Sequence, residues 1–272
     1  MKKLTAYLLV SIMAVFALAG CGVLQEPEAA SGTIEAIPLE TQSAGVVATE
    51  SAPSTEPALE PAPTTEQAAE ATAAPEPTDE PAAPTEAPVE APAGEAKVYT
   101  IDSAASQVRF QLDEDLRGVR TTVVGITDQV AGQLSLNLGD LSQTQVGVIQ
   151  INARTLVTDN NFRNRAIQNE ILDTGDYEFI TFTPTGIEGL PASAAIGETV
   201  SFTLVGDLTI RDVTLPATFA VEATAVSDTQ ITGSATAVVN RADFGLQIPS
   251  VPSVANVDEA VQLFIDFTAN AS

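Results

Sequence analysis

The chain has 272 residues and is acidic, with 36 Asp and Glu against 11 Lys and Arg and a formal net charge of −25 at pH 7. An acidic chain without a basic cluster repels polyphosphate backbones, which argues against nucleic-acid binding. The sequence has no His and a single Cys. Because His is the commonest general base and metal ligand, we expect neither enzymatic catalysis nor a bound metal ion.

The first 20 residues predict a lipoprotein signal peptide. Lys2 and Lys3 precede a short apolar run over residues 8–18, and Leu18-Ala19-Gly20 leads into Cys21. The run is shorter than the roughly 20 apolar residues that a transmembrane helix needs. We therefore expect a lipidated Cys21 and an extracytoplasmic chain held on the membrane, in the periplasm or on the outer cell surface.

Residues 21–96 are predicted to comprise the lipidated cysteine and a linker that follows it. Residues 22–96 contain no Lys or Arg, but 15 Asp and Glu and 12 of the 17 prolines. A segment with so much charge and proline, and almost no aromatic residue, does not bury enough apolar surface to offset the entropy of ordering. The linker is predicted to be disordered, to span more than the roughly 45–50 Å of a flexible chain of its length, and to act as a nonspecific spacer.

Residues 97–272 predict one domain dominated by β-strands. Apolar and polar residues alternate over residues 108–112, 134–138, 202–210, 213–223 and 261–267. This alternation is typical of antiparallel strands with one wet face. Turn residues between the runs give about eight or nine strands, which fit either a meandering barrel or a sandwich.

One segment of the domain has helical spacing. Thr158-Asp159-Asn160-Asn161 offers capping side chains, and the apolar residues that follow recur three or four positions apart: Phe162, Ala166, Ile167 and Ile171. A short helix is therefore predicted over residues 161–172, where it would plug or flank one end of a barrel.

Four motifs in order resemble the YceI-like family. They are Tyr99-Thr100-Ile101-Asp102-Ser103 with Val108-Arg109-Phe110, the segment from Thr158-Asp159 to Tyr177 and Ile180-Thr181-Phe182, the run from Gly206 to Thr214, and Arg241-Ala242-Asp243-Phe244-Gly245 with Val257 to Val261. Asn164 stands where the family usually has Asp, and Glu178 where Pro usually follows the Tyr. The resemblance covers residues 98–269 and implies an extended, lipocalin-like antiparallel β-barrel of about eight strands, whose lumen holds a long isoprenoid chain.

The resemblance also implies that the apolar rows line a tunnel for an isoprenoid or quinone-like tail. The candidate lining residues are Phe110, Leu134, Leu136, Phe202, Leu204, Leu208, Phe219, Val221, Leu263, Ile265 and Phe267. Each buried methylene contributes about 0.8 kcal/mol, so such a tail needs no polar anchor. The same rows would equally form a dry, packed core, because an inward strand residue is apolar in either case.

Charged residues offer fewer candidates. Arg163 and Arg165, near the helix start, suit contact with a polar or anionic headgroup, or are solvated and pair locally with Asp159 or Glu170. The densest acidic cluster, Asp113-Glu114-Asp115, is interpreted as a solvated turn, with weak calcium binding as a lesser alternative. Sequence neighbours do not converge as the paired carboxylates of a glycosidase do.

The sequence thus favours a lipid-anchored binding protein, carrier or store, with an apolar long-chain lipid and the membrane as partners and no cofactor beyond the bound lipid. The alternative is a cell-surface interaction module with a packed barrel and no ligand, which would show apolar patches outside the barrel. An extracytoplasmic hydrolase ranks third, because no spacing of carboxylates suggests its cleft. Whether two copies form a homodimer stays open.

Overall fold

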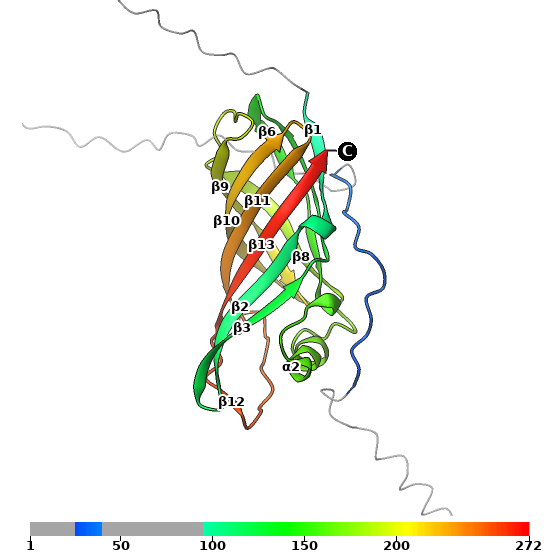
Figure 1. Cartoon of the computed structure of the whole chain (residues 1–272), viewed down its shortest axis with the longest axis vertical. Coiled ribbons are helices and arrows are strands. Elements are labelled where there is room, and N and C mark those ends of the chain that lie inside the picture. Colours follow the sequence, from blue (N-terminus) through cyan, green and yellow to red (C-terminus); the bar gives the residue numbers. More distant parts are fainter. Residues whose placement is uncertain (1–24, 40–94, 272) are drawn as a thin grey trace, which may run out of the picture.

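The computed structural model describes residues 25–39 and 95–271. The predicted signal peptide, Cys21 and most of the predicted linker lie outside the described residues. Within them, 13 strands form a single curled antiparallel sheet, accompanied by one short α-helix, which confirms the all-β architecture (Figure 1). The turn spacing predicted fewer strands, because some of those in the structure are only two residues long.

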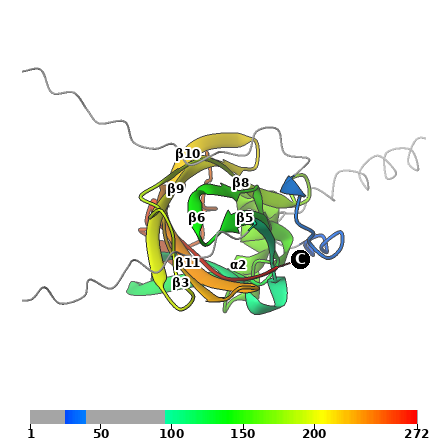
Figure 2. The same ribbon diagram turned by 90° about the horizontal axis from the view of Figure 1, so that it is seen from above.

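The sheet closes into a barrel. Its hydrogen-bonded order is β4 (Val130–Ala131), β7 (Ile149–Asn152), β8 (Phe179–Glu188), β9 (Thr199–Ile210), β10 (Val213–Ser227), β11 (Gln230–Asn240), β13 (Ala260–Ala271), β1 (Lys97–Ile101), β5 (Gln133–Asn137) and β6 (Asp140–Val146). Gly132 alone separates β4, at one end of this order, from β5, near the other. Viewed from above, the strands accordingly form a ring (Figure 2).

The two halves of β13 pair with different strands. Its C-terminal residues pair with β1, whereas residues 262–266 pair with β2 (Gln107–Leu116). β2 continues through a tight turn into β3 (Val119–Thr127), and it also pairs with the two residues of β12 (Val254–Ala255). This hairpin extends the barrel wall toward the end at which the helix lies, called here the lower end (Figure 1).

The predicted alternation is visible in the burial of the strands. On β10, Ala217, Phe219 and Val221 are buried, while Thr218 and Ala220 between them are exposed. The inward row belongs to a core that includes residues from β7 to β13. Phe219 contacts the ring of Phe182 on β8 edge to face, with 4.8 Å between centroids.

The predicted helix is present, but its second half has another geometry. α2 spans Asn161–Ala166, and the Asn160 side chain accepts hydrogen bonds from the backbone N–H groups of Phe162 and Arg163, at 2.9 and 3.3 Å. A π-helical turn over Ile167–Ile171 follows. Over only two turns, apolar residues three or four positions apart do not distinguish an α-helix from a π-helical turn. No helix among the described residues is long and apolar enough to cross a bilayer.

Residues 25–39, called here the strap, lie along the outside of the barrel rather than extending from it (Figure 1, blue). Ile34 is buried, with 8% of its surface exposed. This differs from the disordered linker predicted for the whole of residues 22–96. The composition of that stretch is an average, and the average conceals a local group of apolar residues, Ile34, Ile37 and Leu39.

The close contact of β8 with β9 depends on Gly206. A Cβ at this position would lie 2.4 Å from the carbonyl oxygen of Thr183 and 2.7 Å from the ring of Phe182. Gly206→Ala must therefore push the strands apart, and we expect a loss of about 1–3 kcal/mol in the free energy of unfolding, measured in urea. Gly32→Ala, whose Cβ would meet nothing within 4 Å, is the control. Equal stability of the two variants would contradict this account.

Candidate functional site

An upper and a lower cavity lie inside the barrel. The lower one has a volume of about 830 Å³ and the upper one about 120 Å³. Pockets that hold small ligands usually measure about 300–1,000 Å³. Only the lower cavity therefore has room for a ligand without movement of side chains.

The lower cavity has walls of three kinds. β2 and β3 form one side, α2 and the π-helical turn form another, and the segment of residues 241–257 forms a third. Most lining residues are apolar; those with polar groups are Glu114, Arg117, Thr121, Asn160, Arg163, Arg241 and Ser253. The Arg241 guanidinium donates to the backbone carbonyls of Leu246, Val257 and Asp258, at 3.2, 3.4 and 3.0 Å, which holds the two ends of this segment together.

One layer of side chains separates the two cavities. Along β9, Leu204 lines the upper cavity, Ile210 lines the lower one, and Leu208 between them lines neither. Leu208 is buried, as are Ala217 on β10 and Ala237 on β11, which also line neither cavity. The cavities therefore lie end to end along the barrel axis.

The predicted lining residues are distributed over both cavities. Phe110 and Leu263 line the lower one, and Leu208 belongs to the layer between. The upper cavity is lined by the other eight, which are Leu134, Leu136, Phe202, Leu204, Phe219, Val221, Ile265 and Phe267. Their contact with a ligand stays a prediction. Arg163, a predicted headgroup contact on the helix, does line the lower cavity. The apolar lining candidates came from strands alone and so missed those of the helix and of residues 241–257, although the apolar spacing of Ile167 and Ile171 was a usable signal.

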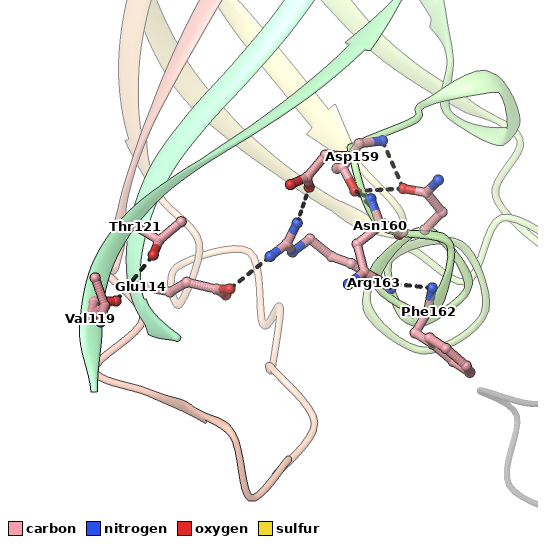
Figure 3. A network of polar contacts seen from close by, with 9 residues as sticks. Glu114, Val119, Thr121, Asp159, Asn160, Phe162 and Arg163 are labelled. Atoms are coloured by element: carbon pink, nitrogen blue, oxygen red, sulfur yellow. Dashed lines mark hydrogen bonds and ion pairs between the residues drawn. The ribbon is translucent and has the colours of Figure 1, made fainter. Parts of the chain in front are cut away.

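The lower cavity opens between its exposed lining residues Val119, Phe162 and Val251, called here its mouth, and an ion pair joins two of its walls. Arg163 on α2 contacts Glu114 on β2 at 2.8 Å and also pairs with Asp159 (Figure 3). The side chains of Arg163 and Glu114 are 16% and 7% exposed. Arg165, the other predicted headgroup contact, lines neither cavity.

The sequence predicted a solvated turn at the acidic cluster Asp113-Glu114-Asp115. This prediction was wrong, because the cluster belongs to β2. The strand's alternation turns Glu114 inward, between Leu112 and Leu116 of the same cavity wall. Asp113 and Asp115 lie on the other face of the strand, near the Arg120 guanidinium at 3.8 and 3.7 Å. A carboxylate in the inward row needs a cation, and Arg163 supplies it. No group of three or more potential metal-ligating side chains was found among the described residues.

We expect removal of the Arg163 charge to destabilise the fold. In Arg163→Met, the nearly buried Glu114 loses its cation, which should cost about 1–3 kcal/mol because the pair is partly screened by solvent. Arg165→Met, two residues later on the same helix, should cost less, since Met and Arg have similar helix propensities. Urea unfolding of both variants measures the difference, and equal losses would contradict a specific role of the pair.

Comparison with known proteins gives a family and a fold. Residues 99–269 match the YceI-like domain, and no curated protein matches the chain. A polyisoprenoid binding domain from Saccharophagus degradans, implicated in plant cell wall breakdown, is 18% identical with a TM-score of 0.51, over 64% of this chain and 98% of that one. BcnA from Burkholderia cenocepacia is 19% identical with a TM-score of 0.48, over 62% and 99%.

The YCEI protein of Campylobacter jejuni is 18% identical with a TM-score of 0.42, over 53% of this chain and 81% of that one. At such identities the first of these structures supports the fold and nothing finer. The family match is broader, since it spans more than half of the chain and includes at least part of every strand, and the helix described above. The chain belongs to the YceI-like domain family.

Proposed function

We propose that this protein binds the apolar tail of a long-chain lipid, isoprenoid or quinone-like, in the lower cavity of its barrel, and serves as a carrier or store that makes and breaks no covalent bond. The observation that carries the proposal is the lower cavity, about 830 Å³ and lined mainly by apolar side chains. The similar fold of a polyisoprenoid binding domain supports the same class of ligand.

The cavity volume also weighs against the alternative of a surface module with a packed lumen. Protein interiors are close-packed, and voids larger than a water molecule are few. A lumen packed with side chains would leave no cavity of about 830 Å³. A lipid tail gains about 0.8 kcal/mol for each methylene that it buries there, so affinity does not depend on the headgroup.

The Arg163–Glu114 pair bears on the headgroup. Arg163 already contacts two carboxylates, those of Glu114 and Asp159. An anionic headgroup would have to displace one of them, whereas a carbonyl or hydroxyl would accept a hydrogen bond without that cost. We therefore propose a polar, uncharged headgroup at Arg163, and no direct contact with Arg165.

The anchoring half of the proposal rests on the sequence around Cys21. With two or more acyl chains on Cys21 the protein would stay on the membrane, whereas one chain binds reversibly. Mass spectrometry of the full chain purified from bacterial membranes should show N-terminal acylation at Cys21, and Cys21→Ala should abolish it. A mature chain with an unmodified Cys21 would refute anchoring and leave ligand binding untouched.

Ligand binding is tested by filling the cavity. The chain of residues 22–272, purified without detergent, should carry a stoichiometric lipid in native mass spectrometry. Leu263→Trp adds bulk to the lower cavity and should reduce the liganded fraction by at least fivefold. Gln262→Trp adds a Trp to the exposed face of the same strand and should leave it unchanged. A wild-type protein that stays unliganded after incubation with long-chain isoprenoids and quinones would instead support the surface module.

A further inference from the structure

We propose that the lower end of the barrel docks on a lipid bilayer, so that the mouth of the lower cavity faces the membrane and the strap holds it there. This inference rests on the proposed anchoring at Cys21 and adds what anchoring alone does not give, which is an orientation. The partner is the bilayer surface, and the contact would let an apolar tail pass between membrane and cavity with little exposure to water.

The strap is bound to the barrel by specific contacts. Arg154 pairs with Glu28 of the strap at 3.0 Å and with Glu178 at 3.2 Å. Glu178 also accepts a hydrogen bond from the Ser31 backbone N–H, at 2.8 Å. Burial raises the pKa of Glu178, but the bonds from Ser31 and Asn152 and the charge of Arg154 together lower it below its ordinary value. Glu178 is one of the two residues at which this sequence departs from the family pattern, and a Pro there would have no such acceptor.

The strap begins beside the mouth of the lower cavity. The side-chain amide of Asn169 donates to the backbone carbonyl of Gln25, at 3.0 Å. Asn169 belongs to the π-helical turn, whose residues Ile167 and Ile171 line the lower cavity. In Figure 1 the strap accordingly runs upward from the level of α2.

The length of chain before the strap limits how far this end can lie from the anchor. Only residues 22–24 separate Cys21 from Gln25, and at 3.3–3.6 Å per residue these four steps reach about 14 Å at most. A free linker of residues 22–96 would instead allow an r.m.s. separation of about 45–50 Å. An acylated Cys21 therefore keeps the helix end of the barrel against the bilayer surface.

The rim of the same mouth is apolar and exposed. Val119 follows the β2–β3 turn, Phe162 lies on α2, and Val251 precedes β12; they are 66%, 66% and 43% exposed, and all three line the lower cavity. Figure 3 shows the Phe162 ring pointing away from the strands. Exposed apolar side chains around a cavity mouth mark an interaction surface, and aromatic and aliphatic tips enter the headgroup region favourably.

Charge selects the kind of bilayer. Residues 97–272 contain 21 Asp and Glu against 9 Lys and Arg, so an anionic surface would repel the domain. Docking must therefore come from the apolar rim and the anchor rather than from charge attraction. Vesicles of zwitterionic phosphatidylcholine are the suitable probe.

The orientation is tested with labels at single sites. The acylated Cys21 does not react, so a cysteine introduced by Val119→Cys, Phe162→Cys or Ile196→Cys takes an environment-sensitive fluorophore alone. Ile196 is 58% exposed and lies between β8 and β9, near the upper cavity, so it serves as the control for the opposite end. The acylated full chain is placed on phosphatidylcholine vesicles that contain nitroxide-labelled lipid.

We expect the nitroxide to quench the labels at positions 119 and 162 at least threefold more than the label at 196. Equal quenching at all three sites, or none at 119 and 162, would overturn the proposed orientation. Lipid carried by the 22–272 chain is measured separately. If the chain carries lipid while the labels at 119 and 162 stay unquenched, the orientation is wrong and the proposed function stands. If the chain carries no lipid while these labels are quenched, the orientation stands and the proposed function is wrong.

The role of the strap is tested by releasing it while the anchor stays. Ile34→Ser removes the buried side chain of the strap, and Glu35→Ser alters its exposed neighbour. In Ile34→Ser, quenching at position 162 should fall to the level of the control at 196, because the barrel then hangs from a long linker. Glu35→Ser should change nothing. Unchanged quenching in Ile34→Ser would show that the strap does not orient the barrel.

Discussion

Closure of the sheet is the constraint on which the rest of this structure depends. A closed barrel removes the exposed edge strands of an open sheet, but it leaves two ends through which an apolar interior meets water. The upper end is covered by the β5–β6 hairpin, which lies within the outline of the barrel in Figure 2. Leu136 and Leu141 of this hairpin are buried in a small core with Tyr99. The lower end is covered less completely, and the large cavity lies there.

The Arg163–Glu114 pair follows from that incomplete cover. α2 lies at the end of the barrel and has no strand ladder to hold it, so its position depends on side-chain contacts with the wall. An apolar residue at position 114 would continue the inward row but would not fix the helix. The Glu114 carboxylate instead forms an ion pair with Arg163 of the helix. This pair holds α2 against β2, and both elements line the lower cavity.

The strands, the helix and the antiparallel architecture could be predicted because each rests on a local period. Glu114 was misplaced because three successive acidic residues suggested a turn, although the alternation of Val108, Phe110 and Leu112 continues through Glu114 to Leu116 and was a usable signal. Leu208 was predicted to line the lumen with the rest of its row. The inward-facing residues of β9 form one continuous row, so nothing in β9 itself marks Leu208 as different. The layer that divides the lumen there depends on which residues of β10 and β11 lie beside Leu208. The position of that layer is not readable from one strand.

The strap changes what the long acidic segment does. Leu39 ends the strap with its N–H bonded to the Gln133 side chain, and Lys97 begins β1 opposite Leu136, three residues further along β5. Residues 40–94 therefore leave and return at nearly the same place, so they add no reach between anchor and barrel while the strap is bound. Closing a loop of that length costs about 3–4 kcal/mol, which opposes binding of the strap. Release of the strap would convert the same segment from a closed loop into a long tether.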